Sequence, residues 1–314
     1  MRRDGKLVKD VGPMYLIAPF IMTERSDSMN MIEIRAAYDP IHNYVIQKRK
    51  EGKRISHMAV VLAAYVRTVS QFKSLNRFVV RSRIYAHNDL SVGMVVLRPG
   101  EKEGTMGKIK FDLYDTVFDV NEKIEKYVEA NSNAQNVNGL DKIMKAIIGV
   151  PGLMRFLTWL IRFADRHGLL PRAICDISPF HESMVFTNLA SIKTNHIYHH
   201  IYNFGTCNMI MAMGNTVETP RSVGGEVTLT KEIPFGLVMD ERIADGHYFA
   251  EAFSAMKKYL ADPSLLETPP QDVEYDFPFP TLSSRFPTKK QIKAEKKAAK
   301  KAAKEAKKAK KAEK

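Results

Sequence analysis

Residues 235–260 read FGLVMDERIADGHYFAEAFSAMKKYL, a pattern typical of a buried strand, a charged turn and an amphipathic helix. The apolar run 235–239 has the length expected for the strand. In the helix, apolar side chains recur at spacings of four, three and four, which places them on one face: Phe249, Phe253, Met256 and Leu260. Asp245 is expected to cap this helix, and Gly246 eases the chain into its first turn. A catalytic side chain is well held where a rigid strand gives way to a helix.

The composition favours a globular protein with one substantial core or two small ones. The chain has 314 residues and 45% apolar content, enough to bury such a core. Its two cysteines, Cys175 and Cys207, allow one disulfide at most. The N-terminus is basic, but no apolar segment long enough for a signal peptide follows it. We therefore expect a protein of the reducing cytoplasm.

The positive charge is concentrated at the C-terminus. Residues 289–314 contain 13 Lys and 3 Glu, a charge of +10, which leaves +3 of the total +13 for residues 1–288. A nucleic-acid-binding domain would be expected to spread its positive charge over a face of the folded part. The distribution therefore argues against specific nucleic-acid binding.

Several other segments carry the periodicity of strands and helices. Strands are expected at 31–38, 77–80, 91–96 and 109–114, and helices at 55–69 and 117–130. Ser56 is placed to cap the first of these helices. The pair Gly224 and Gly225, between two β-branched segments, predicts a hairpin turn rather than a phosphate-binding loop.

The 235–260 segment resembles the signature of the chloramphenicol acetyltransferase superfamily. It is most similar to the catalytic (acyltransferase) domain of 2-oxo acid dehydrogenase complexes, which carries Asp-His-Arg-x-x-Asp-Gly before such a helix. Four positions match this pattern: Asp240, Arg242, Asp245 and Gly246. Glu241 stands where the family has its catalytic histidine.

Two further segments resemble the same family. Residues 55–97 are similar to a helix, a Ser-x-Leu-Asn-type turn and a strand of the family, and 184–189 (MVFTNL) is similar to its Thr-Ile-Ser-Asn-Leu-Gly. The resemblance covers most of residues 14–263 in the family's order. It implies an α/β fold with a mixed, largely antiparallel sheet flanked by helices.

The resemblance also implies a chemistry. In the family, the histidine takes a proton from a thiol or hydroxyl acceptor that attacks an acyl thioester, and a hydroxyl stabilises the oxyanion. An imidazole suits this role because its pKa of about 6.5 lies near neutral pH. Here Glu241 takes the base position, Thr187 the hydroxyl position with Asn188 beside it, and Asp245 the position that holds the turn through an ion pair. Arg25 and Arg35 are the nearest candidates for the ion-pair partner of Asp245.

Three hypotheses follow from the replacement of the histidine. Glu241 is a desolvated base, or another residue such as His247 has taken over, or the site is inactive and the fold serves as a trimeric scaffold or ligand-binding protein. The family implies a homotrimer whose site forms between subunits, with acyl-CoA as substrate and a small-molecule acceptor. No lipoyl domain precedes the matching region, so no lipoyl group is expected on this chain.

Residues 141–174 form an apolar insert that the family's dehydrogenase cores lack. The longest apolar run, 146–154, is nine residues, whereas a bilayer span needs about 20. The insert is expected to pack as helices on the sheet or over the acyl site, with its arginines reaching outward. The alternative is a helix lying on a membrane surface, which would make the protein a peripheral membrane acyltransferase.

The remaining predictions concern boundaries and metals. We divide the chain into an N-terminal extension (1–13), the acyltransferase-like domain (14–268), a Pro-containing linker (269–288) and a disordered Lys/Ala-rich tail (289–314). The tail is read as a solubilising extension, with contact to acidic lipid as the alternative. The histidines at positions 196, 199 and 200 lack a complete ligand set, so no metal site is expected.

Overall fold

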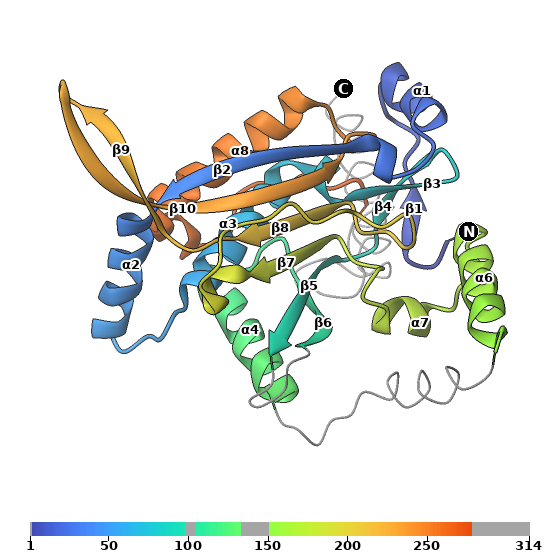
Figure 1. Cartoon of the computed structure of the whole chain (residues 1–314), viewed down its shortest axis with the longest axis horizontal. Helices are drawn as coiled ribbons and strands as arrows, with labels where there is room; N and C mark the ends of the chain where they lie inside the picture. The colour runs from blue at the N-terminus through green and yellow to red at the C-terminus, as the bar shows by residue number, and fades with distance from the viewer. Residues whose placement is uncertain (1, 98–103, 133–150, 278–314) are drawn as a thin grey trace, which may run out of the picture. The chain divides into compact units, whose positions relative to one another are not determined.

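The central element is a sheet in the order β2-β10-β8-β7-β5-β6, with β9 paired to one end of β10 (Figure 1). β7 runs parallel to both β5 and β8, and the other described pairings of this sheet are antiparallel. The computed structural model describes residues 2–97, 104–132 and 151–277. The strands are β2 (Met29–Ala37), β5 (Leu90–Leu97), β6 (Gly104–Phe111), β7 (Met184–Asn188), β8 (Met209–Met213), β9 (Val217–Val223) and β10 (Glu226–Asp240).

A second, three-stranded sheet joins β1 (Gly5–Leu7), β4 (Arg83–His87) and β3 (Arg77–Val80), in the order β1-β4-β3. The segment 1–13, set apart above as an extension, therefore contributes a strand to the folded unit. At the other end, Arg77 forms an ion pair of 2.7 Å with Asp276, so part of the expected linker is also held in place. The folded unit spans residues 1–277, and the Lys/Ala tail lies outside the described residues.

Helices α3 (His57–Gln71), α4 (Val117–Ser132) and α8 (Gly246–Ala261) pack together against the sheet (Figure 1). α3 begins as predicted, because the Ser56 side chain accepts a hydrogen bond from the Ala59 N–H at 3.1 Å. Each residue of α3 from 59 to 70 is buried. A helix that is apolar on every side belongs in the middle of a core, and α3 lies in contact with both α4 and α8.

The predicted strand, turn and helix at 235–260 are confirmed. The strand is the end of β10, and the Asp245 side chain caps α8 by accepting a hydrogen bond from the Tyr248 N–H at 2.8 Å. The four residues predicted to share the apolar face of the helix are all buried: Phe249, Phe253, Met256 and Leu260. The remaining helices of the first half are α1 (Pro13–Ile21) and α2 (Tyr38–Lys50).

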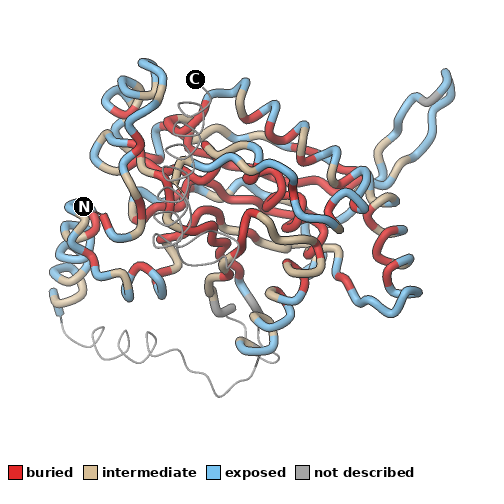
Figure 2. Tube along the Cα trace, turned by 180° about the vertical axis from the view of Figure 1, so that it is seen from behind, coloured by how far each residue is buried: buried red, intermediate tan, exposed pale blue. Residues whose placement is uncertain are grey.

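The hairpin of β9 and β10 projects from the body of the molecule, and Figure 2 shows it exposed along its length. Its two-residue turn is Gly224 and Gly225, with φ of 62° and 92°. Positive φ at both central positions is the geometry of a tight hairpin turn and favours glycine. The predicted hairpin is therefore confirmed.

The apolar insert differs from the prediction. Its described part contains α6 (Leu153–Arg166) and α7 (Arg172–Ile177), while 141–150 lies outside the described residues. The expectation that α6 packs with its apolar side chains inward is wrong, because several are half exposed: Phe156 (57%), Trp159 (59%), Leu160 (42%) and Phe163 (43%). Among the described helices, none has the length and apolarity needed to cross a bilayer.

Replacing Phe253 by alanine should lower the free energy of unfolding by about 3–5 kcal/mol, since it empties a fully buried site between α8 and its neighbours. His247→Ala is the matched control on the same helix, because its side chain is 82% exposed and should change stability by less than about 0.5 kcal/mol. Urea denaturation measures both. Equal effects of the two substitutions would contradict the assigned face of α8.

Candidate functional site

The turn that follows β10 is organised by the buried carboxylate of Asp240. Oδ1 accepts hydrogen bonds from the Ser28 hydroxyl at 3.0 Å, the Arg242 N–H at 3.1 Å and the Arg242 Nε at 2.8 Å. Oδ2 accepts from Arg242 Nη2 at 2.8 Å and lies 3.5 Å from Arg25 Nε. Both arginines are buried as well, so Asp240 neutralises part of a buried positive cluster.

The remaining donors of the two arginines bind backbone carbonyls. Arg242 Nη1 donates to two carbonyls just after α1, those of Met22 and Thr23, at 3.2 Å each. Arg25 donates to three carbonyls from distant segments, at 2.6 to 3.2 Å: Tyr202, Val79 and Gly205. These bonds fix the turn after β10 against the start of β2, the end of β3 and the loop before β8.

Burial tends to raise the pKa of the Asp240 carboxyl group and to lower the pKa of the Arg25 guanidinium group. Burial alone would raise the pKa of Asp240, but the hydrogen bonds and charge of Arg242, with the charge of Arg25, lower it below its ordinary value. Burial lowers the pKa of Arg25, and the charge of Asp240 opposes that effect. Asp240 is thus held as a carboxylate. The ion pair between Asp240 and Arg242 lies within the sequence motif, because the two residues are only two positions apart.

Glu241 occupies the first position of this turn. Its backbone N–H donates to the Ser28 carbonyl at 2.8 Å, and its side chain is half-buried. The carboxylate forms no hydrogen bond or ion pair with the residues that the structure describes. His247, the alternative base, points into solvent and lies 3.5 Å from Glu251 one turn along α8. Glu241 is therefore a carboxylate of this turn that is left without a partner among the described residues, whereas Asp245 caps α8.

Asp245 holds the turn by hydrogen bonds instead of an ion pair. Besides capping α8, its Oδ2 accepts from the Tyr15 hydroxyl at 3.0 Å. Of the two arginines considered as its partner, Arg25 pairs with Asp240, and Arg35 pairs with Glu33 and Glu232. Neither is placed against Asp245, so the ion-pair function expected at this position is carried by Asp240.

Thr187 lies far from Glu241 within one chain. Thr187 in β7 pairs with Ala212 in β8, which pairs with Gly236 in β10. Gly236 precedes Glu241 by five residues, which is about 17 Å along a strand. β7 and β10 run in opposite directions, so Thr187 and Asn188 lie toward one end of the sheet and Glu241 at the other (Figure 1). A single copy does not bring them together.

The loop before β8 covers the sheet near Thr187. A Cβ on Gly236 would lie 2.5 Å from the carbonyl oxygen of Ile197, so only glycine fits under this loop. The three clustered histidines, at positions 196, 199 and 200, lie in this loop, outside any described helix. His196 Nε2 lies 3.8 Å from a Glu33 carboxylate oxygen.

One cluster of side chains has the composition of a metal site. Asp4, Cys175 and His181 each offer a ligand atom, all within 4.8 Å of one another. These atoms already have other partners or hold their protons, because Asp4 accepts two hydrogen bonds from Arg2, and burial raises the pKa of the Cys175 thiol to about 12. The cluster is better described as a buried polar network. Both cysteines of the chain are free and buried.

The sequence and the fold of this chain are similar to those of known acyltransferases. Residues 183–268 match the sequence family described as 2-oxoacid dehydrogenases acyltransferase (catalytic domain). The cubic core of a pyruvate dehydrogenase multienzyme complex is similar in structure, with a TM-score of 0.54, 12% identity and coverage of 82% of this chain and 93% of that chain. The fold is chloramphenicol acetyltransferase-like.

Two other solved structures agree with this acetyltransferase-like fold. Dihydrolipoamide acetyltransferase of Azotobacter vinelandii gives a TM-score of 0.53 at 13% identity, covering 82% of this chain and 93% of that one. A chloramphenicol acetyltransferase gives 0.51 at 8% identity, covering 82% and 99%. A search of curated proteins gives no match. The predicted fold class, a mixed and largely antiparallel sheet with flanking helices, is confirmed.

Asp240→Asn should lower the free energy of unfolding by about 3–5 kcal/mol at pH 7, because it leaves Arg25 and Arg242 buried without a counter-charge. The folded pKa of Asp240 is lowered, so its contribution is complete above the unfolded value of about 3.9 and is lost as pH falls through the folded value. The difference between wild type and variant should therefore shrink below about pH 4. Denaturation of both proteins at several pH values measures it.

Asp272→Asn serves as the control, since Asp272 is exposed and should change stability by less than about 0.5 kcal/mol. Equal stability of wild type and Asp240→Asn at neutral pH would contradict the role of Asp240.

Proposed function

We propose that this chain transfers an acyl group from acyl-CoA to a small thiol or hydroxyl acceptor, at a site shared between two copies. The observation that carries the proposal is the placement of Glu241 and Thr187 at opposite ends of one sheet, in a chain whose residues 183–268 match an acyltransferase catalytic domain. Two groups that one chain separates can meet when the end of β10 in one copy faces the end of β7 in the next.

A head-to-tail contact of this kind favours a closed ring. Heterologous interfaces generate rings when the rotation between copies closes, and a trimer is the ring that the family resemblance implies. Each copy would then give Glu241 to one site and Thr187 to another. One of the similar structures is itself the core of a larger assembly, which supports a multimeric state for this fold.

The proposed reaction uses the two side chains in sequence. The Glu241 carboxylate takes the proton of the acceptor as its sulfur or oxygen attacks the thioester carbonyl carbon. The carbonyl oxygen becomes an oxyanion that accepts a hydrogen bond from the Thr187 hydroxyl of the neighbouring copy. The carbon–sulfur bond of the thioester then breaks, and the proton moves from Glu241 to the departing CoA sulfur. Asp240 and Asp245 position the turn without touching the reacting atoms.

The similar Azotobacter vinelandii enzyme supports this assignment. Its structural and enzymatic study concerns a serine, a histidine and an asparagine of the catalytic mechanism, the last two being four residues apart. Glu241 and Asp245 have the same spacing, and Thr187 is the hydroxyl residue of the matching strand. In this correspondence Asp245 takes the asparagine position.

The two free cysteines favour the cytoplasm as the location of this protein.

An inactive trimeric scaffold is the second candidate function. It is favoured by the replacement of the histidine and by the lack of any side-chain partner that orients Glu241 among the described residues. A catalytic base is normally oriented by another side chain or backbone group. The variants below separate the two functions.

Glu241→Gln should reduce acyl transfer about 10²- to 10⁴-fold, because it removes the general base. Glu241→His should raise the rate, since a neutral imidazole is a base suited to neutral pH. The assay follows the release of free CoA from acetyl-CoA with a dithiol acceptor. Glu251→Gln on α8 is the matched control and should leave the rate unchanged. A rate indifferent to both changes at 241 would remove this residue from the mechanism, and the lack of any transfer would favour the scaffold.

Mixed assemblies test whether the site is shared. Copies with Glu241→Gln and copies with Thr187→Val should each be nearly inactive alone, whereas co-expression of the two should restore about a quarter of the wild-type rate. In a trimeric ring, every mixed trimer contains one interface with both groups intact. The control is the double variant Glu241→Gln, Thr187→Val expressed alone, because none of its interfaces contains both groups. Absence of any recovery in verified mixed trimers would place the two groups in separate functions.

A further inference from the structure

A cavity of about 830 Å³ lies between α6, the turn joining β3 and β4, and the segment 23–25 that follows α1. Its size is that of a site for a small organic ligand. Neither Glu241 nor Thr187 lines it, although Arg242, the neighbour of Glu241, does. Six arginines line the cavity: Arg25, Arg81, Arg155, Arg162, Arg166 and Arg242. We call it the arginine pocket.

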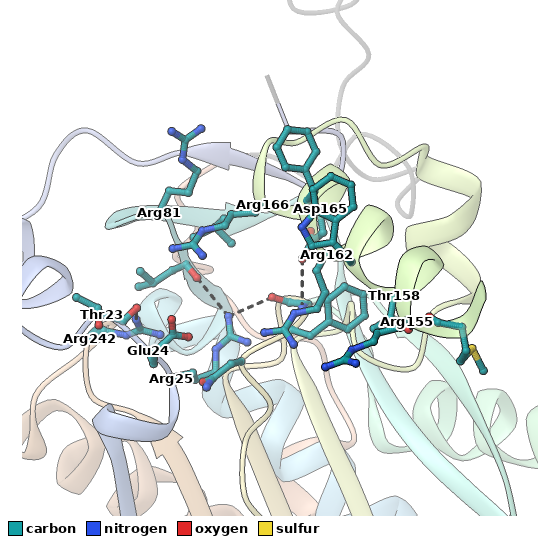
Figure 3. A pocket seen from close by; sticks show the side chains of 18 residues that line it. Thr23, Glu24, Arg25, Arg81, Arg155, Thr158, Arg162, Asp165, Arg166 and Arg242 are labelled. Atoms are coloured by element: carbon teal, nitrogen blue, oxygen red, sulfur yellow. Dashed lines mark hydrogen bonds between the residues drawn. The ribbon is translucent and has the colours of Figure 1, made fainter. Parts of the chain in front are cut away.

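The arginines of the pocket form two groups. Arg25 and Arg242 lie on its floor, and their donors bind Asp240 and backbone carbonyls (Figure 3). The other four, Arg81, Arg155, Arg162 and Arg166, form no hydrogen bond or ion pair with any residue in the described parts of the chain. Three of them extend from α6 toward the cavity, whereas Arg81 lines its opposite side, with its guanidinium pointing away from the other arginines in Figure 3.

The acidic residues of the pocket do not balance this charge. Asp165 lines the cavity, but its carboxylate is bound by Arg2 at 2.6 Å and lies 3.2 Å from His181. Glu24 is the other carboxylate in the lining. Four arginines without partners therefore face one free carboxylate, which leaves about three positive charges uncompensated. A phosphate ester carries about −1.5 to −2 at pH 7, so two phosphate groups would match this excess.

Aromatic rings form the wall of the pocket that α6 provides. Trp159 and Phe163 both line the cavity, and their rings stack with centroids 5.7 Å apart and planes 23° apart. Phe156 continues the stack at 6.1 Å from Trp159. Half-exposed aromatic rings beside unpaired arginines are a surface on which a flat group can stack while its phosphates bind the guanidinium groups.

The helix that carries this wall is fixed to the body of the molecule. Arg2 Nη1 donates to the Asp165 carbonyl at 2.6 Å, and the Gly205 N–H donates to Asp165 Oδ2 at 3.3 Å. Asp165 is buried, in contrast to the exposed residues around it on α6. Three arginines of α6 and the two of its aromatic residues that line the cavity are thereby held on the side opposite Arg25 and Arg242, so the pocket is formed before a ligand arrives.

We infer that the arginine pocket binds a ligand with at least two phosphate groups joined to a flat or apolar group. The phosphates contact Arg155, Arg162 and Arg166, and the flat group lies against Trp159. A soluble nucleoside diphosphate and a phospholipid with two phosphate groups share this chemistry. Glu241 and Thr187, the residues of the proposed reaction, lie outside the cavity.

Trp159 is the only tryptophan of the chain, so its fluorescence reports directly on the pocket. The full-length protein is titrated with inorganic diphosphate, with ADP, and with vesicles of phosphatidylcholine that either contain or lack cardiolipin, a lipid with two phosphate groups. A saturable change with ADP identifies a nucleotide-type ligand. A change with the cardiolipin-containing vesicles and none with vesicles of phosphatidylcholine alone identifies lipid phosphates as the source. Either result supports the pocket if the variants below remove it.

The double variant Arg155→Ala, Arg162→Ala should weaken the binding of the effective probe about tenfold or more, because each guanidinium supplies a charge-assisted bond. Arg54→Ala, an exposed arginine outside the pocket, is the control and should bind as wild type. By calorimetry, Trp159→Ala should weaken ADP several-fold and leave diphosphate unchanged if a base stacks there. No response to any probe at millimolar concentration, or equal binding by the double variant and wild type, overturns the proposal.

Discussion

The carboxylate of Asp240 connects parts of the chain that are distant in sequence and fixes the turn on which the proposed chemistry depends. It binds Ser28 before β2 and Arg242 after β10, and it neutralises the nearby Arg25. Through these arginines it also positions carbonyls of β3 and of the loop before β8. A buried ion cluster is costly to form and costly to break. The cluster fixes the path of the turn that carries Glu241.

The sequence predicted the segments whose pattern is set by the core. The face of α8, the cap at Ser56 and the glycine hairpin all follow from spacing and turn chemistry, and the structure confirms each of them. The family motif also identified the position of Glu241. Such features are local, because each depends on residues within about two helical turns of one another.

What the sequence did not predict depends on contacts between distant segments. The burial of Asp240, and therefore its pairing with Arg25, requires four segments to meet, which no local pattern records. The exposure of the apolar side chains of α6 was missed because an apolar helix is normally buried. The separation of Thr187 and Glu241 follows from strand order, which neither motif contains. Strand β4 was also missed, since its residues 83–87 show only a weak alternation.

β10 links the exposed hairpin to the Glu241 turn without interruption. It is a single strand of 15 residues, about 50 Å long, with the hairpin at its start and Asp240 at its end. The hairpin presents two exposed apolar side chains, Val227 and Leu229, which the described parts of the chain leave uncovered. An extended strand cannot be stretched much further. A partner bound to the hairpin would therefore lie at a fixed distance, set by the length of β10, from the turn that carries Glu241. The length of β10 thereby sets the spacing between this turn and any partner of the hairpin.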